Sequence, residues 1–266
     1  MKLSVITTFF NSSDYISDCL KSVQDINSKH EVEHILVNDG SKDNTLEIIN
    51  SQKLKNIIIV GKHHVGRGAA LNLGLKNATG DYICILDSDD MINPSWIDFF
   101  CSNYKDYDHG GVFFGKVSTN IDKFKSYEPP STISCKHLNP IRILFYNPIC
   151  HSGSIFKHSP VTKINGYSTS IKSQFDWDLW LRLYFMNESF IKINYIAAFK
   201  RLHSNQSFES KKHFLYTSRG VILQLKAAMR TKPVYFFPVF IFSIIRIIWS
   251  FVPRRLRTSR LFSMLR

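Results

Sequence analysis

The sequence predicts an α/β fold built on a mainly parallel, doubly wound sheet. Short apolar runs rich in β-branched residues alternate with amphipathic segments of helical period along the N-terminal part of the chain. Strands that alternate with helices in this way form parallel sheets through right-handed crossovers. The chain has 266 residues, 44% of them hydrophobic, which is enough for one large α/β domain or two small ones.

The first four strands and the helices between them follow from this alternation. The strands are expected over residues 3–9, 32–37, 56–60 and 80–86. The connecting helices are expected over 14–24, from about 45, and over 66–76. Further on, helices are expected over 96–104 and 139–146 and around 176–186, and strands over 111–117, from about 155, and over 190–198. Residues 119–136 show no regular pattern and are expected as a variable loop.

The fourth strand ends in three carboxylates, Asp87, Asp89 and Asp90. Clustered carboxylates at the edge of a sheet are hard oxygen ligands, which suit Mn²⁺ or Mg²⁺ and leave coordination positions open for phosphate oxygens. The alternative is a solvated acidic loop that begins the next helix, with Asp90 or Asn93 as its N-cap.

The other three strands also end in residues suited to binding. Ligands of doubly wound sheets bind at the carboxyl ends of the strands. There the first strand leads to Asn11, the second to Asp39, and the third to a helix N-terminus at 66–68 that carries Arg67 and suits phosphate. The glycine pair at 66–68 is too short for the dinucleotide fingerprint and follows the third strand, which disfavours a hydride-transfer dehydrogenase.

Four motifs resemble the successive blocks of the family 2 glycosyltransferases with a GT-A fold. They are residues 4–11, 37–41, 66–72 and 86–90, and the resemblance covers about residues 3–208. It implies transfer of a sugar from a nucleoside-diphosphate sugar, UDP-sugar by preference, to a hydroxyl of a glycan or lipid-linked oligosaccharide. Asn38 stands where the family usually has Asp, while the carboxylate that contacts the base is retained as Asp39.

The resemblance also implies the residues that bind the donor. Asp39 would accept a hydrogen bond from the base, and Phe10 would pack against its ring. Nucleotide-sugar contacts are expected at Thr8, Phe10, Asn11, Asp39, Arg67, Asp87, Ser88 and Arg201. Two alternatives stay open: Asp39 as an Asx-turn residue, and Arg67 as a solvated residue at a helix start.

The metal site and the catalytic base come from the same resemblance. Asp89 would ligate Mn²⁺ or Mg²⁺, and His203, in a block that resembles the family's Arg-x-His, would complete the site. Asp176 matches the proposed base of a single inverting displacement, although Phe175 replaces the Glu that usually precedes it. Asp176 as a helix N-cap and Asp178 as the true base remain alternatives.

The acceptor side is less defined by the sequence. His151 lies in a loop that leads into a strand, where it would position an acceptor or a phosphate, or serve only as a structural loop residue. Trp177 and Asp178, beside Asp176, are further acceptor candidates. The irregular residues 119–136 are expected to cover this side.

The C-terminal part of the chain differs in character. We expect a GT-A domain over residues 1–208, with a nucleotide-binding half (1–118) and an acceptor half (119–208), and a helical, basic tail over 209–266. Residues 234–252 are mostly apolar but contain Pro238 and Arg246, which favours an interfacial helix on an anionic membrane surface. A buried core helix and a single membrane span are the alternatives.

Charge and cysteine usage limit the class of protein. The net charge of +13 and the sequence pI near 9.5 favour anionic partners, but nothing beyond this charge suggests nucleic acid. The five cysteines show no CxxC spacing, and Met1 leads into a strand without a cleavage site, so we expect the cytoplasmic face of the cell membrane.

Two other functions remain possible from the sequence. A non-catalytic sugar-nucleotide-binding subunit of a membrane glycan-assembly complex is suggested by Phe175, where the Glu is missing. A nucleotidyltransferase is disfavoured, because no glycine-rich phosphate loop follows the first strand.

Overall fold

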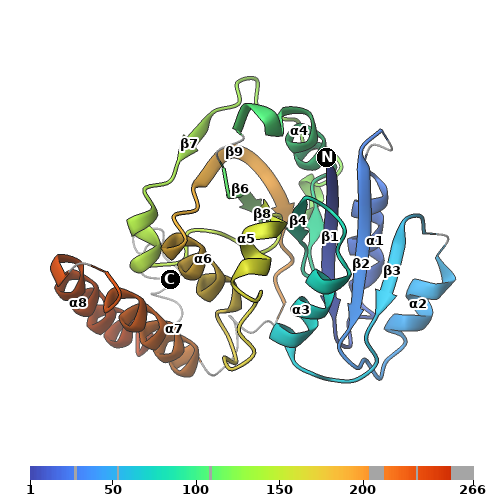
Figure 1. Cartoon of the computed structure of the whole chain (residues 1–266). Helices are drawn as coiled ribbons and strands as arrows, with labels where there is room; N and C mark the ends of the chain where they lie inside the picture. The colour runs from blue at the N-terminus through green and yellow to red at the C-terminus, as the bar shows by residue number, and fades with distance from the viewer. Residues whose placement is uncertain (27–28, 53, 108–109, 204–212, 232, 253–266) are drawn as a thin grey trace.

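A single mixed sheet with helices on both faces forms the body of the protein (Figure 1). The computed structural model describes residues 1–266 except 27–28, 53, 108–109, 204–212, 232 and 253–266. Within this part of the chain the strand order is β3-β2-β1-β4-β8-β6-β9-β5, and β7 pairs with β9 outside that path.

The N-terminal half is the predicted parallel sheet. Its strands are β1 (Lys2–Phe9), β2 (Glu31–Asn38), β3 (Ile57–Val60) and β4 (Tyr82–Ile85), all parallel to their neighbours. They are joined by α1 (Ile16–Gln24), α2 (Thr45–Ser51) and α3 (Arg67–Asn77). Phe9 lies opposite Asn38, so the carboxyl ends of β1 and β2 are level at one edge of the sheet.

Beyond β4 the sheet becomes mixed. β8 (Ile155–Lys157) is antiparallel to β4, and β6 (Val112–Ser118) is antiparallel to β8 and parallel to β9 (Phe190–Phe199). β5 (Met91–Ile92) and β7 (Cys135–His137) both pair antiparallel with β9. β5 and β7 are too short to show a period of two, so the sequence did not predict them, although β8, with three residues, was expected from about residue 155.

The remaining elements include helices that the sequence predicted and short helices over 104–107, 121–123 and 158–163 that it did not. They are α4 (Pro94–Asn103), η1 (Tyr104–Tyr107), η2 (Ile121–Lys123), η3 (Pro140–Leu144), α5 (His158–Lys163), α6 (Phe175–Phe185), α7 (His213–Ala228) and α8 (Pro233–Ser250). The helix expected over 139–146 is only the short 3₁₀ helix η3, capped by Asn139. The start of the helical tail expected from residue 209 lies outside the described residues.

The described residues form three hydrophobic cores, and the two larger ones cover the two faces of the sheet. One core joins α3 and α6 to the sheet through residues such as Leu71 and Trp180, which are 1% and 0% exposed. The other joins α1 and α4 to the opposite face, where Trp96 is fully buried and its indole donates to the Gly153 carbonyl (2.9 Å). Helices on both faces are the arrangement expected of a doubly wound sheet.

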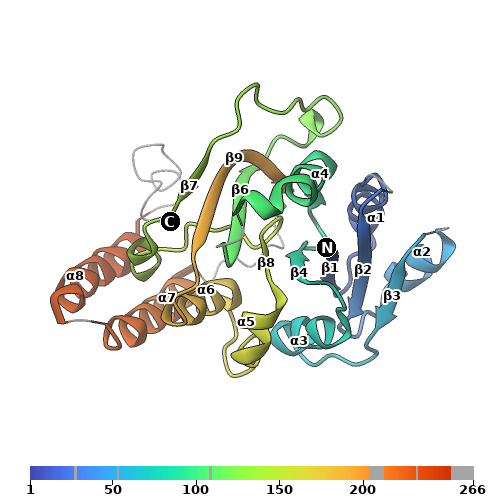
Figure 2. The same cartoon turned by 45° about the horizontal axis from the view of Figure 1, so that its top comes forward.

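The last two helices form a hairpin at one end of the molecule. Figures 1 and 2 agree that α7 and α8 lie side by side, at the end of the sheet opposite β3 and α2. The hairpin packs on α6 and η3, and Gln224 of α7 donates to the Phe145 carbonyl (2.9 Å). Among the described residues, no helix has the length and apolar character needed to cross a membrane.

Glu33 ties the start of three parallel strands together. Its carboxylate is 7% exposed and accepts hydrogen bonds from the Ser4 hydroxyl (2.6 Å) and from the Thr79 amide and hydroxyl (2.7 and 2.9 Å). Lys2 adds an ion pair at 3.0 Å. Burial raises the pKa of Glu33, but these hydrogen bonds outweigh burial and the pKa is lowered.

We expect Glu33→Gln to lower the free energy of unfolding by about 1–3 kcal/mol near neutral pH, because it removes charge-assisted hydrogen bonds and turns an amide donor toward other donors. The folded pKa lies below the unfolded one. The contribution of Glu33 is therefore complete above the unfolded pKa of about 4.3 and is lost as pH falls through the folded pKa. Urea unfolding as a function of pH would show the wild type and the variant converging in acid.

Glu31→Gln, an exposed position on the same strand, is the matched control and should change stability by less than about 0.5 kcal/mol. A deficit of Glu33→Gln that persists unchanged in acid would contradict the assignment.

Candidate functional site

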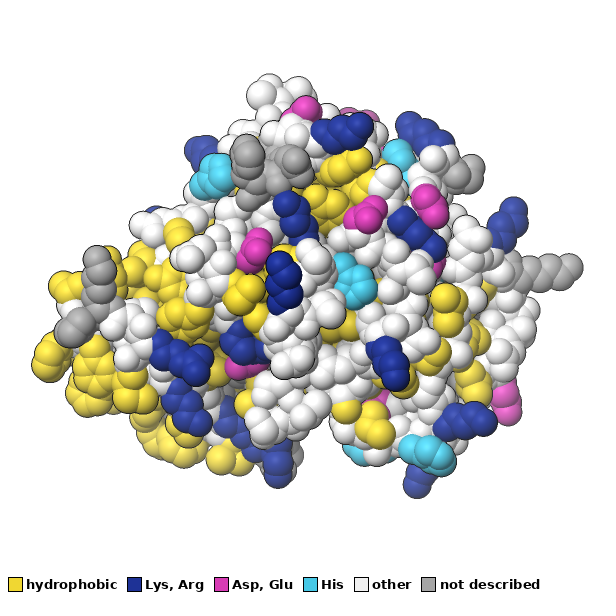
Figure 3. All heavy atoms as spheres, in the orientation of Figure 1, with side chains coloured by type: hydrophobic (Ala, Val, Ile, Leu, Met, Phe, Trp, Pro, Cys, Tyr) yellow, Lys and Arg dark blue, Asp and Glu magenta, His cyan; other side chains and the backbone are white. Residues whose placement is uncertain are grey.

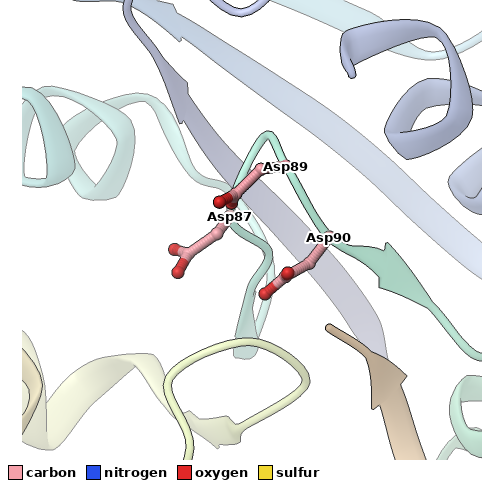
Figure 4. Close-up of side chains that lie close together, drawn as sticks. All are labelled: Asp87, Asp89 and Asp90. Atoms are coloured by element: carbon pink, nitrogen blue, oxygen red, sulfur yellow. The ribbon is translucent and has the colours of Figure 1, made fainter. Parts of the chain in front are cut away.

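A cluster of three carboxylates lies on the loop that follows β4 (Figure 4). The chain leaves the sheet after Ile85 and turns, with the Asp90 amide donating to the Asp87 carbonyl (3.0 Å). Oxygens of Asp87, Asp89 and Asp90 lie within 4.8 Å of one another. The solvated acidic loop considered from the sequence does not describe them, because Asp90 is buried and the other two are partly buried.

Asp90 is the structural member of the cluster. It is 1% exposed, and its two carboxylate oxygens accept from the Ser152 hydroxyl (2.6 Å) and the Arg201 amide (3.1 Å). Burial, followed by the charges of Asp87 and Asp89, raises the pKa of Asp90 to about 7. Asp90 therefore joins the loop after β4 to the segments that begin at residues 150 and 200. Asn93 caps α4 by accepting from the Ser95 amide.

Asp89 lies beside His203, the two residues that the sequence analysis names as metal ligands. The His203 Nε2 is 2.8 Å from Asp89 Oδ2, and the imidazole stacks on Tyr15 with ring centroids 4.8 Å apart. Its Nδ1 is buried without a hydrogen-bond partner in the part of the chain that the structure describes. Carboxylate oxygens with one imidazole suit Mn²⁺ or Mg²⁺, so Asp87, Asp89 and His203 fit such an ion.

Arg201 lies close to this pair, but its side chain turns toward α1. Its guanidinium contacts Asp18 (2.6 Å) and lies over the Tyr15 ring, 5.3 Å from the centroid. The expected contact of Arg201 with a diphosphate therefore requires a different rotamer, and this role stays a prediction.

Arg67 joins the carboxylates to a buried histidine. Its Nη2 donates to Asp87 Oδ1 and lies 3.4 Å from His151 Nδ1. Because a guanidinium only donates, Nδ1 accepts, and the Nε2–H of His151 donates to the Tyr167 hydroxyl (2.8 Å). Burial lowers the pKa of His151, which favours this neutral form. Burial raises the pKa of Asp87, but the charge of Arg67 is the largest of the effects that lower it, and the pKa lies below its ordinary value.

His151 is thus placed behind Arg67 and is only 7% exposed. This position suits a residue that orients Arg67 better than one that contacts an acceptor directly. Arg67 is the first residue of α3 and pairs with Asp87, while 41% of its side chain is exposed, so the solvated helix-start residue that the sequence left open also describes it, and its contact with a donor stays a prediction.

The exits of β1 and β2 form a second group of polar residues. One oxygen of Asp39 accepts from the amides of Val65 and Gly66 (2.7 and 3.1 Å), and the other lies 3.2 Å from His64 Nδ1. Phe10, 47% exposed, lies against the His64 ring with centroids 4.9 Å apart. Asp39 therefore holds the loop before α3 while one face of Phe10 stays open to a ligand.

The other residues expected near the donor line the same edge. Thr8 is half-buried opposite Val37, and the Ser88 hydroxyl lies 2.9 Å from that of Ser12. Asn11 has a left-handed backbone (φ 50°), and its side-chain oxygen accepts from the Lys42 amide (2.8 Å). Their contacts with a nucleotide stay predictions.

Asp176 occupies the first turn of α6. Gln174 takes the N-cap position, so the alternative of Asp176 as the cap is wrong. Asp176 Oδ2 accepts from the side-chain amide of Asn147 (2.7 Å), and its charge is close enough to raise the pKa of Arg67 after the larger effect of Asp87. Asp178 is instead 9% exposed and paired with Arg182 (2.8 Å).

Trp177 does not lie on an acceptor surface. It is 1% exposed, its indole donates to the Ile143 carbonyl (2.7 Å), and its ring is covered by Arg246 of α8. Trp177 is the third residue of α6, whose first turn packs on η3, so its side chain faces the core, which sequence adjacency to Asp176 could not reveal. The same burial and pairing make Asp178 a poor acceptor contact.

Sequence reasoning missed several residues that shape the site. His64 contacts Asp39, Asn147 contacts Asp176, Tyr167 holds His151, and Ser152 holds Asp90. His64 lies two residues before the glycine that opens α3, and Asn147 lies just before the His151 loop. These near positions were the available signals, but the contacting residues lie 16 to 62 residues apart along the chain.

Comparison with known proteins gives a consistent result. A family model described as "Glycosyl transferase family 2" matches residues 4–162. The chain is 29% identical over 192 residues to poly-beta-1,6-N-acetyl-D-glucosamine synthase of Staphylococcus aureus, covering 68% of this chain and 46% of that protein. It is 37% identical over 115 residues to poly(ribitol-phosphate) beta-glucosyltransferase of Bacillus spizizenii, covering 40% and 18%. The matched part of the chain thus spans about half the length of the first of these relatives and less than a fifth of the second.

Solved structures share the fold. S. aureus TarS 1-349 in complex with UDP-GlcNAc matches with a TM-score of 0.67 and 20% identity, covering 98% of this chain and 74% of that one. The mannosyltransferase PcManGT of Pyrobaculum calidifontis, in complex with GDP-Man and Mn²⁺, matches with a TM-score of 0.66 and 17% identity, covering 94% and 71%.

We expect Asp89→Asn to weaken Mn²⁺ binding, measured with UDP present, by at least about tenfold, because the change removes the negative charge that a hard cation requires. Titration of free Mn²⁺ by electron paramagnetic resonance measures this directly. Asp122→Asn, an exposed carboxylate on η2, is the control and should bind Mn²⁺ as the wild type does. Equal affinity of Asp89→Asn and wild type would remove Asp89 from the ligand set.

Proposed function

The chain belongs to glycosyl transferase family 2 and has the GT-A fold, and from this premise we propose that it transfers a sugar from a nucleoside-diphosphate sugar to a hydroxyl of a glycan or lipid-linked acceptor. One observation carries the proposal. Asp176, Arg67 and the carboxylates Asp87 and Asp89 meet at the carboxyl edge of the sheet, although they come from three separate segments. A base, a cation for phosphate and oxygen ligands for a metal ion are the groups that such a transfer needs.

A UDP-sugar is the preferred donor in this proposal. Asp39 offers a carboxylate oxygen to an N–H of the base, and the exposed ring of Phe10 offers a stacking surface next to it. Thr8, Asn11, Ser88 and Arg201 would complete the donor contacts. The structural neighbours are complexes with UDP-GlcNAc and with GDP-Man, so a nucleotide sugar is supported and the base is the part that needs a test.

Asp89 and His203, with Asp87, would hold Mn²⁺ or Mg²⁺ in the proposed reaction. When bound, the ion offsets the negative charge that develops on the departing diphosphate. Asp87 keeps Arg67 in place on the other side, where its guanidinium can meet phosphate oxygens.

Asp176 is the proposed general base of a single inverting displacement. It would take the proton from the acceptor hydroxyl as that oxygen attacks the anomeric carbon. Asn147 holds one oxygen of Asp176 by a hydrogen bond and so orients the carboxylate. Asp178, the competing candidate, is already paired with Arg182 inside the protein, which supports Asp176.

The acceptor and the location complete the proposal. The glycan or lipid-linked acceptor would enter between the Asp176 side of the site and residues 119–136, with His151 orienting Arg67 behind it. We propose a GT-A unit over residues 1–208, a membrane-associating tail over 209–266, and a position at the cytoplasmic face of the cell membrane.

The donor is tested by thermal stabilisation with UDP, GDP, dTDP and CMP, each with and without Mn²⁺. A saturating nucleotide at 100 times its dissociation constant stabilises a protein by about 2.7 kcal/mol. We expect UDP with Mn²⁺ to raise the melting temperature most. A larger rise with GDP would show that the donor carries guanine instead of uracil. No rise with any nucleotide would contradict donor binding.

The base is tested by Asp176→Asn, which should lower transfer at least about 10²-fold while donor affinity stays within about twofold of wild type, because only proton removal is lost. Asp178→Asn is the matched control on the same helix turn and should retain donor binding and most of the activity. Wild-type turnover in Asp176→Asn would exclude it as the base. Donor binding without turnover in the wild type would favour a non-catalytic binding subunit.

A further inference from the structure

Helix α8 has its polar and apolar faces reversed. Its buried residues include Ser243, Arg246 and Ser250, which are 1%, 5% and 9% exposed. Its solvent-exposed face, continued by Phe251, is made of large apolar side chains: Val234, Phe237, Phe240, Ile241, Ile244, Ile245, Ile248 and Phe251, which are 42–71% exposed. A surface helix of a globular protein in water shows the opposite arrangement.

Arg246 shows that this reversal is built into the packing. The sequence places a cation in the middle of the apolar run, but its side chain points inward. Its Nη1 donates to Gln224 of α7 (3.2 Å), and its guanidinium lies 5.0 Å from the centroid of the Trp177 ring. Gln224 in turn donates to the Phe145 carbonyl (2.9 Å). The outward face of α8 is thereby left without a charge.

The apolar face is also large and continuous. Figure 3 shows hydrophobic side chains gathered over α8, with Lys and Arg side chains along their border. The adjacent α7 also exposes the apolar residues Leu215 and Ile222, and Met229, which follows it, is exposed as well. A contiguous apolar surface of this kind, rimmed by polar groups, marks an interaction site.

The positive charge of the C-terminal part of the chain favours an anionic partner for this face. Residues 210–266 contain four Lys, eight Arg and no Asp or Glu, which accounts for 12 of the net 13 positive charges. Arg219 and Lys226 are exposed on α7, and Arg230 is exposed just after it. A second copy of the chain would bring two basic hairpins together and repel, whereas anionic lipid headgroups beside an apolar interior match both the charge and the apolar surface.

We propose that the outward face of α8 docks onto an anionic lipid bilayer, with the helix axis in the plane of the membrane. The opposite face of α8 is occupied along its length by protein contacts at Val239, Ser243, Arg246 and Ser250, so lipid can reach one side only. The apolar side chains enter the boundary between headgroups and acyl chains, and the basic residues of α7 meet the headgroups.

Docking through this face has a consequence for the catalytic edge. Arg246 covers Trp177, and Trp177 is the neighbour of Asp176 on α6. The lipid-binding helix is therefore packed directly on the helix that carries the proposed base. Resting on the proposed function, this arrangement holds Asp176 at a fixed position relative to the bilayer, where an acceptor attached to a lipid would be presented.

The experiment measures binding of the full chain to phosphatidylcholine vesicles with and without phosphatidylglycerol, by co-flotation. We expect wild type to bind only the anionic vesicles. Ile241→Glu with Ile248→Glu should weaken this binding at least about tenfold, because two apolar side chains that would be buried in the lipid become charged. No donor or acceptor is present, so the outcome is independent of transfer activity.

Leu46→Glu with Ile58→Glu is the matched control, since it adds the same two charges at exposed apolar positions on α2 and β3. It should bind vesicles within about twofold of wild type. The proposal is overturned if wild type stays unbound, if both double variants bind alike, or if wild type is a dimer without lipid that only the α8 variant converts to a monomer.

A second measurement needs no charged variant. Trp249 lies on α8, whereas Trp96, Trp177 and Trp180 are at most 1% exposed in the core. Vesicles with brominated acyl chains should quench the fluorescence of wild type and leave that of Trp249→Phe largely unchanged. Equal quenching of the two proteins, or none in wild type, would overturn the placement of α8 in the lipid boundary.

Discussion

The site depends on how the protein keeps three carboxylates together at the end of β4. At separations below 4.8 Å, each pair of ionised carboxylates repels by about 3 kcal/mol at an effective dielectric constant of 20. The surrounding residues offset this repulsion: Arg67 pairs with Asp87, His203 lies against Asp89, and Ser152 donates to Asp90. Burial and the two neighbouring charges raise the pKa of Asp90, so its protonation relieves part of the crowding.

Arg67 comes from α3 in the parallel half, but His203 and Ser152 come from the mixed half of the sheet, and a very short pairing brings His203 there. Met91 of β5 lies opposite Phe199 of β9, so the chain after β9 runs alongside the carboxylate loop. This register places the Arg201 amide on Asp90 and His203 on Asp89. The antiparallel β8 brings Ser152 and His151 in from the other side, because the loop before it ends level with β4. The parallel half alone would leave the carboxylates without these partners.

The C-terminal hairpin joins this chemistry to the surface of the molecule. Gln224 and Arg246 form a buried polar contact that holds α7 and α8 against Trp177 and η3. Burying a guanidinium is unfavourable unless it is paired, and here the Trp177 ring and the Gln224 side chain supply the favourable contacts. Polar residues of α8 face the interior of the protein, and its large apolar residues face outward, which suits contact with lipid better than contact with water.

The sequence by itself determined the parallel half of the fold and much of the candidate site. The apolar runs of β1 to β4 and the helices between them depend on local periodicity, and their order implies one shared edge where Asp39, Arg67 and Asp87 meet. Only the tertiary structure decided that β5 and β7 exist, that Gln174 rather than Asp176 caps α6, and that Arg246 faces Trp177. The physical reason is the same in each case. A two-residue strand, a cap and the direction of a long side chain are set by contacts with residues far along the chain, and no local pattern contains them.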